Sequence, residues 1–321
     1  MNRYRLLATF AATAAVTGGA AATASAATVD QQAAVSQNWA GYVAGGTQFS
    51  SVSGSWVQPT AKCGSGQTYS AFWVGIGGSS NQSSALEQTG TQADCTADGG
   101  TDYYAWYELV PAAPVKLDLA IKPGDHISAK VNVSGSNVTV LMSDQTTGQS
   151  TSKALQMDNP DTSSAEWIAE APSACDGSGS CQPLPLADFG TVQFTSATAT
   201  ANGHTGTISD PNWSAQPVQL GGGSVSNVSY GSDTGASGAS PSSLSSDGSS
   251  FSVAAQASSG STGATGGAGD YGYGNGGYGD GGYPGAGDGS GYGGYPGDGY
   301  GQNGDGGGGY GYGYGDGYGL F

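Results

Sequence analysis

The chain has very little positive charge. Its 321 residues include 24 acidic residues but only seven Lys or Arg and two His. Both Arg residues lie at the extreme N-terminus, so five Lys face 24 acidic residues in the rest of the chain, a formal charge of −19. We expect no nucleic-acid partner, because phosphate binding requires clustered Lys and Arg. A chain with so few basic residues is suited to acidic conditions, because little positive charge is left to repel itself once the carboxylates are protonated. Secreted proteins are also often acidic for solubility alone.

Several catalytic and metal-binding patterns are also missing. The sequence has no Cys-x-x-Cys, and His126 and His204 are isolated, so we expect no metal site and no cofactor. It has no Gly-x-Ser-x-Gly, no His-Glu-x-x-His and no phosphate loop. Two His also argue against a Ser-His-Asp set. The four Cys predict disulfides if the chain is exported, and their spacing alone allows three pairings.

The first 26 residues resemble a secretory signal peptide. Arg3 and Arg5 precede an apolar, Ala-rich run from Leu6 to Ala22, and Ala24-Ser25-Ala26 provides a small-residue cleavage site. This run is too short and too rich in Ala, Gly and Thr for a membrane span, and no later stretch is apolar enough to be one. We therefore predict a secreted, extracellular protein that has no membrane contact once residues 1–26 are removed. Residues 27–36 form a short polar lead-in.

Alternating apolar and polar residues run through the middle of the chain. Val115 to Ile121, Ile127 to Val133 and Val138 to Met142 each alternate, with turn residues between them. No stretch after the signal peptide shows helical periodicity. Many short strands with regular turns predict an all-β, antiparallel β-sandwich over residues 37–258. Other strand candidates are residues 49–57, 69–76, 189–198 and 251–255.

Residues 259–321 differ completely from the rest of the chain. Residues 261–321 contain 30 Gly and 11 Tyr, with no Lys, Arg, Val or Ile. Ordering Gly costs much entropy and almost no aliphatic surface is available to bury, so we predict a disordered Gly/Tyr/Asp-rich tail. Its Tyr residues could contact cell-wall material or polysaccharide, and the simpler alternative is an extended, solvated tail. A monomer is expected.

Three segments between Ala71 and Glu108 concentrate aromatic, amide and carboxyl groups: Trp-Val-Gly-Ile-Gly-Gly, Leu-Glu-Gln-Thr-Gly and Ala-Trp-Tyr-Glu. In a strand, residues two apart share a face. Tyr104, Trp106 and Glu108 then line one face, and Gln88 lies on a face with Leu86. Two aromatic rings and a carboxylate suit a binding surface better than a sealed core, because a buried Glu needs a partner.

Together with Asn-Trp-Ala-Gly at residues 38–41 and Ala-Glu-Trp-Ile-Ala-Glu at residues 165–170, these segments resemble the glutamic peptidases, or eqolisins. The five segments occur in the family's order over roughly residues 36 to 200. The resemblance implies a concanavalin-like sandwich of two curved sheets in a secreted, bacterial-type member. It also implies a peptide or protein substrate.

The resemblance assigns a catalytic dyad to Gln88 and Glu170. Glu170 would take a proton from water and return it to the leaving nitrogen. Gln88 would orient that water through its oxygen and donate an N–H to the developing oxyanion. The family's cleft positions correspond to Trp39, Trp73, Trp106 and Glu108. Glu166 would support the site from the same face as Glu170, whereas Glu87 should face the opposite way.

Further implications concern the cysteines and two departures from the family. The family has a small loop after its catalytic Glu, which implies a Cys175–Cys181 disulfide and leaves Cys63–Cys95 as the second pair. Where family members carry Asp, this chain has Gly77 after Trp-Val-Gly-Ile and Tyr104 before Ala-Trp-Tyr-Glu. Both changes remove a carboxylate near the site, which affects the expected pH optimum and substrate preference.

Two other functions compete with the peptidase. A non-catalytic carbohydrate-binding module would use exposed Trp and Tyr rings to stack on sugars and a tail to contact the wall. A glycoside hydrolase would use Glu166 and Glu170 as its carboxyl pair. Four residues apart on a strand, these two lie roughly 13 Å apart along the backbone, farther than the roughly 5–9.5 Å that such pairs require.

Overall fold

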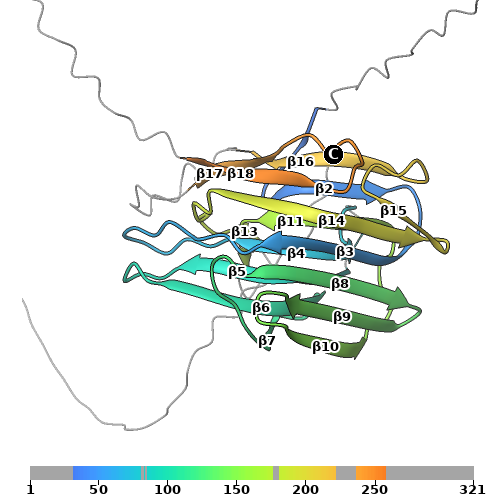
Figure 1. Cartoon of the computed structure of the whole chain (residues 1–321), viewed down its shortest axis with the longest axis horizontal. Coiled ribbons are helices and arrows are strands. Elements are labelled where there is room, and N and C mark those ends of the chain that lie inside the picture. The colour runs from blue at the N-terminus through green and yellow to red at the C-terminus, as the bar shows by residue number, and fades with distance from the viewer. Residues whose placement is uncertain (1–31, 81–82, 84, 176–180, 222–235, 258–321) are drawn as a thin grey trace, which may run out of the picture. The chain divides into compact units, whose positions relative to one another are not determined.

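The computed structural model describes residues 32–80, 83, 85–175, 181–221 and 236–257, and these contain β-strands and no helix (Figure 1). The predicted signal peptide, residues 27–31 of the lead-in and the predicted tail lie outside the described residues. The strands are β1 Ala34–Ser36, β2 Trp39–Gly45, β3 Phe49–Val57, β4 Ala71–Gly77, β5 Leu86–Cys95, β6 Thr101–Val110, β7 Val115–Ala120, β8 His126–Ser134, β9 Asn137–Asp144, β10 Gln149–Gln156, β11 Ser164–Glu170, β12 Ser173–Cys175, β13 Cys181–Pro183, β14 Thr191–Ala201, β15 His204–Thr207, β16 Ser214–Leu220, β17 Ala236–Pro241 and β18 Phe251–Ala257.

Sixteen of these strands form one continuous sheet, in the order β10-β9-β8-β3-β14-β18-β17-β16-β2-β11-β4-β5-β6-β7, with β1 paired to β16 and β15 paired to β14. The sheet curls back on itself. Strands β3, β8 and β9 lie against β4 and β5, and the edge strands β7 and β10 approach each other. Figure 1 shows β8, β9 and β10 side by side within one layer. The prediction of an antiparallel sandwich with two curved layers is confirmed, and hydrogen bonds join the layers through β16 and β17.

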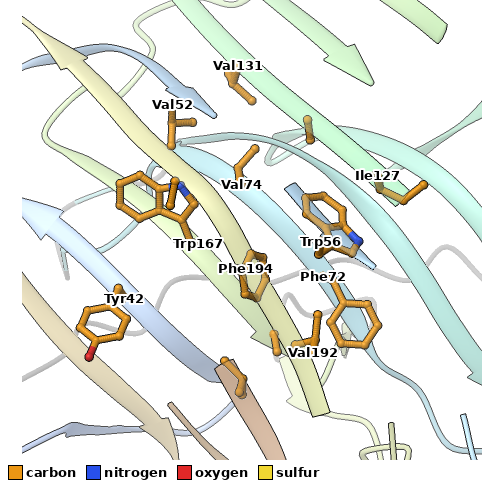
Figure 2. Close-up of a cluster of buried hydrophobic side chains, with 14 of the residues drawn as sticks. Tyr42, Val52, Trp56, Phe72, Val74, Ile127, Val131, Trp167, Val192 and Phe194 are labelled. Carbon is orange, nitrogen blue, oxygen red and sulfur yellow. The ribbon is translucent and has the colours of Figure 1, made fainter. Parts of the chain in front are cut away.

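The main core fills the space between the two layers. Trp56, Phe72, Trp167 and Phe194 are almost fully buried there (Figure 2). Figure 2 also shows Tyr42, Val52, Val74, Ile127, Val131 and Val192 around them. Burying each such side chain stabilises the fold by about 1.5–3 kcal/mol, so this face of each layer is the main source of stability.

The strands β2, β11, β4 and β5 are buried on both faces. On β11, Trp167 and Ala169 point into the main core, while Ile168 belongs to a second apolar cluster on the opposite face. We call this opposite face the outer face; its cluster consists of Trp39, Val43, Ala71, Trp73, Leu86, Trp106, Val110, Ile168 and Val218. Glu166 and Glu170 therefore share the outer face with Ile168, as strand alternation predicts.

The cysteines lie in two separate parts of the fold. The expected Cys63–Cys95 disulfide is formed and joins the loop after β3 to the last residue of β5. Cys175 and Cys181 are register partners across the β12–β13 hairpin, as the second expected disulfide requires. The side chain of Cys175 and residues 176–180 lie outside the described residues.

Candidate functional site

Strand register arranges the outer-face residues in three parallel rows across β11, β4, β5 and β6. Gln88 pairs with Gly75 on one side and Glu108 on the other, whereas Glu170 pairs with Ala71. Gln88 and Glu170 thus share a face but lie two strands and two rows apart. The first row is Glu166, Gly75, Gln88 and Glu108; the second is Ile168, Trp73, Gly90 and Trp106; the third is Glu170, Ala71, Gln92 and Tyr104.

Glu170 is buried and held by N–H donors on both carboxyl oxygens. Asn38 Nδ2 donates to Oε1 at 2.8 Å, and Trp73 Nε1 donates to Oε2 at 2.6 Å. Burial raises the pKa of Glu170 to about 8, and the N–H groups of Trp73, Trp39 and Asn38 oppose that rise. These donors favour the carboxylate, so the geometry equips Glu170 to accept a proton.

Gln88 is fully buried, and the two ends of its side-chain amide differ in their hydrogen bonding. Its Nε2 donates to Glu108 Oε2 at 2.8 Å. Its Oε1 has no hydrogen-bond partner among the described residues. A buried amide oxygen without a partner is costly, so such an atom indicates a place where a water or substrate donor binds.

The Trp73 indole links the two groups. Its Nε1 bonds Glu170, and its Cζ3 lies 2.9 Å from the position that a Gly75 Cβ would occupy. The Gln88 Cβ lies 3.2 Å from that same position. The Trp73 ring therefore binds Glu170 through its N–H and extends to the space above Gly75, which the Gln88 Cβ also borders.

Gly90 of the Gln-Thr-Gly segment lies where no side chain fits. A Cβ there would come within 2.4 Å of the Phe72 carbonyl oxygen and 2.5 Å of the Trp73 Cβ. These distances are shorter than any van der Waals contact. The glycine thus allows β5 to approach β4 closely enough to place Gln88 beside Trp73.

The other predicted cleft residues lie on the same face. The Trp39 and Trp73 rings meet edge to face with centroids 5.1 Å apart, and Tyr104 packs against the same cluster. Trp39, Trp73 and Trp106 are each at most 3% exposed. The carbohydrate-binding alternative required exposed rings, and these three Trp do not provide them.

A second carboxylate replaces the one that Gly77 lacks. Gly77 has φ +88°, and a Cβ on it would lie 2.8 Å from the Asp161 Cβ. Asp161 therefore occupies the space beside position 77, where its Oδ2 accepts hydrogen bonds from Gly78 N at 3.2 Å and Ser83 Oγ at 2.5 Å. The region keeps a carboxylate, supplied by the loop before β11.

Three other carboxyl groups are buried nearby in the fold. Glu166 is on the outer face beside Gly75, and Glu87 faces the opposite way, as predicted; none of their carboxyl oxygens has a partner among the described residues. Desolvation raises the pKa of Glu166 well above its usual range, and desolvation with the nearby Asp161 charge raises that of Glu87 to about 8. Desolvation also raises the pKa of Asp94 to about 8.

Asn38 is the residue that sequence reasoning missed. It lies just before β2 in the Asn-Trp-Ala-Gly segment, and its amide reaches Glu170 across 132 positions of sequence. The segment itself was the available signal, since a buried amide beside a buried carboxyl needs that partner. Glu166, predicted to support the site from the same face as Glu170, lies on that face in the row of Gln88.

The described ranges contain no group of three or more His, Cys, Asp or Glu side chains that could hold a metal ion. They also offer no helix with the length and apolar character that a membrane crossing needs. The candidate site is accordingly built from an amide, carboxyl groups and indole rings.

Known proteins match this chain in sequence and in fold. The sequence profile of the Peptidase A4 family matches residues 37–237. Scytalidopepsin B of Scytalidium lignicola is 32% identical over 187 residues, 56% of this chain and 70% of that protein. Aspergillopepsin-2 of Aspergillus niger is 32% identical over 224 residues, 62% of this chain and 76% of that protein. A crystal structure of scytalido-glutamic peptidase with a transition state analog inhibitor aligns with a TM-score of 0.56 and 29% identity, covering 69% of this chain and 99% of that one.

Proposed function

The chain belongs to the peptidase A4 family of glutamic peptidases and is a hydrolase of peptide bonds, and we propose that it is a secreted acid endopeptidase whose chemistry is divided between Gln88 and Glu170. The observation that carries the proposal is the Trp73 indole, which binds Glu170 at one end and lies against the row of Gln88 at the other. The Trp73 ring thus lies between a proton acceptor and an amide.

Glu170 is the proposed general base and then general acid. As a carboxylate it takes a proton from the attacking water while that water adds to the peptide carbonyl carbon. The tetrahedral intermediate then collapses, the C–N bond breaks, and the same proton passes from Glu170 to the leaving nitrogen. The donors Asn38 and Trp73 stabilise the carboxylate in the first step and hold its oxygens in place.

Gln88 is the proposed partner for the water and the oxyanion. Its free Oε1 accepts a hydrogen bond from the attacking water, and the N–H that does not bind Glu108 donates to the oxygen that becomes negative. A neutral amide keeps its donor at every pH. A second carboxyl in its place would titrate together with Glu170 as a coupled pair.

Activity at acid pH constrains the pKa of Glu170. The base must be ionised, whereas burial raises the pKa of Glu170 to about 8 in the free protein. Binding of the attacking water and the polar peptide group would hydrate the carboxyl and lower this pKa, with the Asn38 and Trp73 hydrogen bonds acting in the same direction. The proposal therefore requires a lower Glu170 pKa in the substrate complex than in the free protein.

The proposed substrate is an unfolded protein or peptide, which can enter the cleft in an extended form. Residues 1–26 would direct export, and the mature protein would act outside the cell as a monomer. Contact of residues 259–321 with cell-wall material is part of the same proposal, although that segment lies outside the described residues.

The test is hydrolysis of a denatured protein between pH 2 and 7 by the purified chain and by Glu170→Gln. We expect cleavage to peak in acid and to fall by at least about 100-fold in the variant, since general acid–base catalysis contributes about 10²–10⁴-fold. The circular dichroism spectrum of the variant should match that of the parent. Absence of cleavage by the folded parent at every pH, or full activity of the variant, would refute the proposal.

A further inference from the structure

We propose that Glu108 is a positioning residue that fixes which way the Gln88 amide faces, an inference that rests on the proposed role of Gln88. The two are register partners on β5 and β6, both at most 1% exposed, and Gln88 Nε2 donates to Glu108 Oε2 at 2.8 Å. This bond assigns the nitrogen end of the amide to β6. It leaves Oε1 and one N–H for the reacting groups.

Strand register makes Glu108 the neighbour that decides this orientation. The cross-strand partners of Gln88 are Gly75 on β4 and Glu108 on β6. Gly75 has no side chain to hold the amide, and a Cβ there would already crowd Trp73 and Leu86. Of the two register partners, Glu108 alone supplies a side-chain hydrogen-bonding group.

The choice of Glu, and not Gln, at position 108 has a physical consequence. An ionised carboxylate only accepts hydrogen bonds. If the Gln88 amide flipped, its Oε1 would face the Glu108 oxygens with no hydrogen between them, which is repulsive. A Gln at position 108 could accept from Nε2 or donate to Oε1, so it would allow both orientations. An ionised Glu108 therefore selects the orientation that turns Oε1 away from β6.

Glu108 acts through Gln88, so its loss should reduce the rate of the chemical step and leave substrate binding unchanged. For Glu108→Leu in the full chain we expect kcat to fall about 10- to 100-fold, the effect of losing one charge-assisted hydrogen bond, with KM within about twofold of the parent. For Glu108→Gln we expect an intermediate kcat. The matched control is Glu87→Leu, which removes a buried carboxyl one residue from Gln88 on the opposite face and should leave kcat unchanged.

A spectroscopic measurement separates positioning from a purely structural role. In protein labelled with nitrogen-15, the Gln88 side-chain NH₂ signals are assigned by their disappearance in Gln88→Glu. In the parent we expect one of the two hydrogens to exchange slowly because Glu108 holds it. In Glu108→Gln, which conserves shape, that protection should fall. Unchanged protection would overturn the inference.

The outcomes also distinguish this inference from the proposed function. Parental kcat in folded Glu108→Leu, with Glu170→Gln inactive, would overturn the role of Glu108 and leave the dyad standing. Activity in Glu170→Gln would overturn the dyad itself. If Glu108→Leu does not fold, Glu108→Gln decides the question by its kcat, KM and amide protection, and parental values for all three would overturn the inference.

Discussion

The two faces of the strands β11, β4 and β5 are equally buried but differ in chemistry. The inner face carries Trp167 and Phe72, which pack in the main core, and the Trp167 N–H donates to the Ser53 carbonyl. The outer face carries Glu170 and Gln88, whose polar atoms are buried with them. Burial alone therefore does not separate core from site. The site is distinguished by its buried hydrogen-bond donors and acceptors. Glu170 has partners within the protein, whereas the Gln88 Oε1 has none in the part of the chain that the structure describes.

The largest expected effect is that of pH on the free energy of unfolding, which depends on buried carboxyl groups on both faces. Glu87 and Glu170 have pKa values raised from 4.5 to about 8, and Asp94 from 3.8 to about 8. In the unfolded chain these groups release protons near their ordinary pKa, so from about pH 4.5 to 8 the unfolded state binds fewer protons than the folded state. Stability is then complete in acid and falls as pH rises, by about 1.4 kcal/mol per pH unit for each group.

The three groups act in the same direction, so we expect the free energy of unfolding to fall as pH rises from 4.5 toward 8, as measured by denaturant midpoints at each pH. A free energy of unfolding that stays level or increases over this range would contradict the assignment of these carboxyl groups as buried and protonated.

Trp167→Ala tests the inner face. Its side chain is fully buried in the main core and its Nε1 donates to the Ser53 carbonyl at 2.8 Å. Replacing a buried Trp with Ala costs about 3–5 kcal/mol, so the free energy of unfolding at pH 4 should fall by that amount. Activity per folded molecule should stay near the parental value. A cost below about 1 kcal/mol would mean that this face is not the main source of stability.

Glu87→Gln changes a carboxyl that has no proposed catalytic role. The substitution removes an ionisable group but keeps its size, so one contribution to the pH dependence disappears. We expect the variant to be about 2 kcal/mol more stable than the parent at pH 6 and nearly equal to it at pH 4. Thermal or denaturant unfolding at both pH values measures this difference, and equal stability at pH 6 would show that Glu87 is ionised in the folded protein.

Trp73→Phe tests the outer face and has the smallest expected effect of these substitutions. The variant keeps an aromatic floor but loses the N–H that donates to Glu170 at 2.6 Å. We expect kcat to fall about 10-fold with stability changed by less than about 1.5 kcal/mol. Trp167→Phe is the control, because it removes an indole N–H on the inner face, where that N–H donates to the Ser53 carbonyl at 2.8 Å. Equal kcat values for the two variants would argue against a role for the Trp73 N–H.

Alternating sequence predicted the fold class and several strands well. Residues 49–57 form β3 with the predicted bounds, and the alternating segments became β7, β8 and β9. The sequence did not predict β10, β16 or β17. β10 has largely exposed, polar side chains on both faces, and β17 is Ser/Gly-rich. Neither strand has an alternating apolar pattern. Both form because neighbouring strands pair with them, so their own sequences do not reveal them.

The site could be predicted only in part. Alternation placed Glu166 and Glu170 on one face, and the family resemblance pointed to Gln88. The offset of Gln88 and Glu170 by two rows depends on β11 pairing with β4, strands that are distant in sequence. Local sequence does not encode such register. Asp161 brings its carboxylate beside Gly77 through a contact between separate loops, which local sequence likewise does not encode.

The most direct test of the account compares two equal substitutions on opposite faces, Glu170→Gln and Glu87→Gln. Single-turnover cleavage of one peptide is measured for both and for the parent, at an acid pH at which all three are folded. The account predicts that Glu170→Gln is at least about 100-fold slower than the parent and that Glu87→Gln matches it. Equal rates in the two variants would contradict the assignment of the outer face as the site of chemistry.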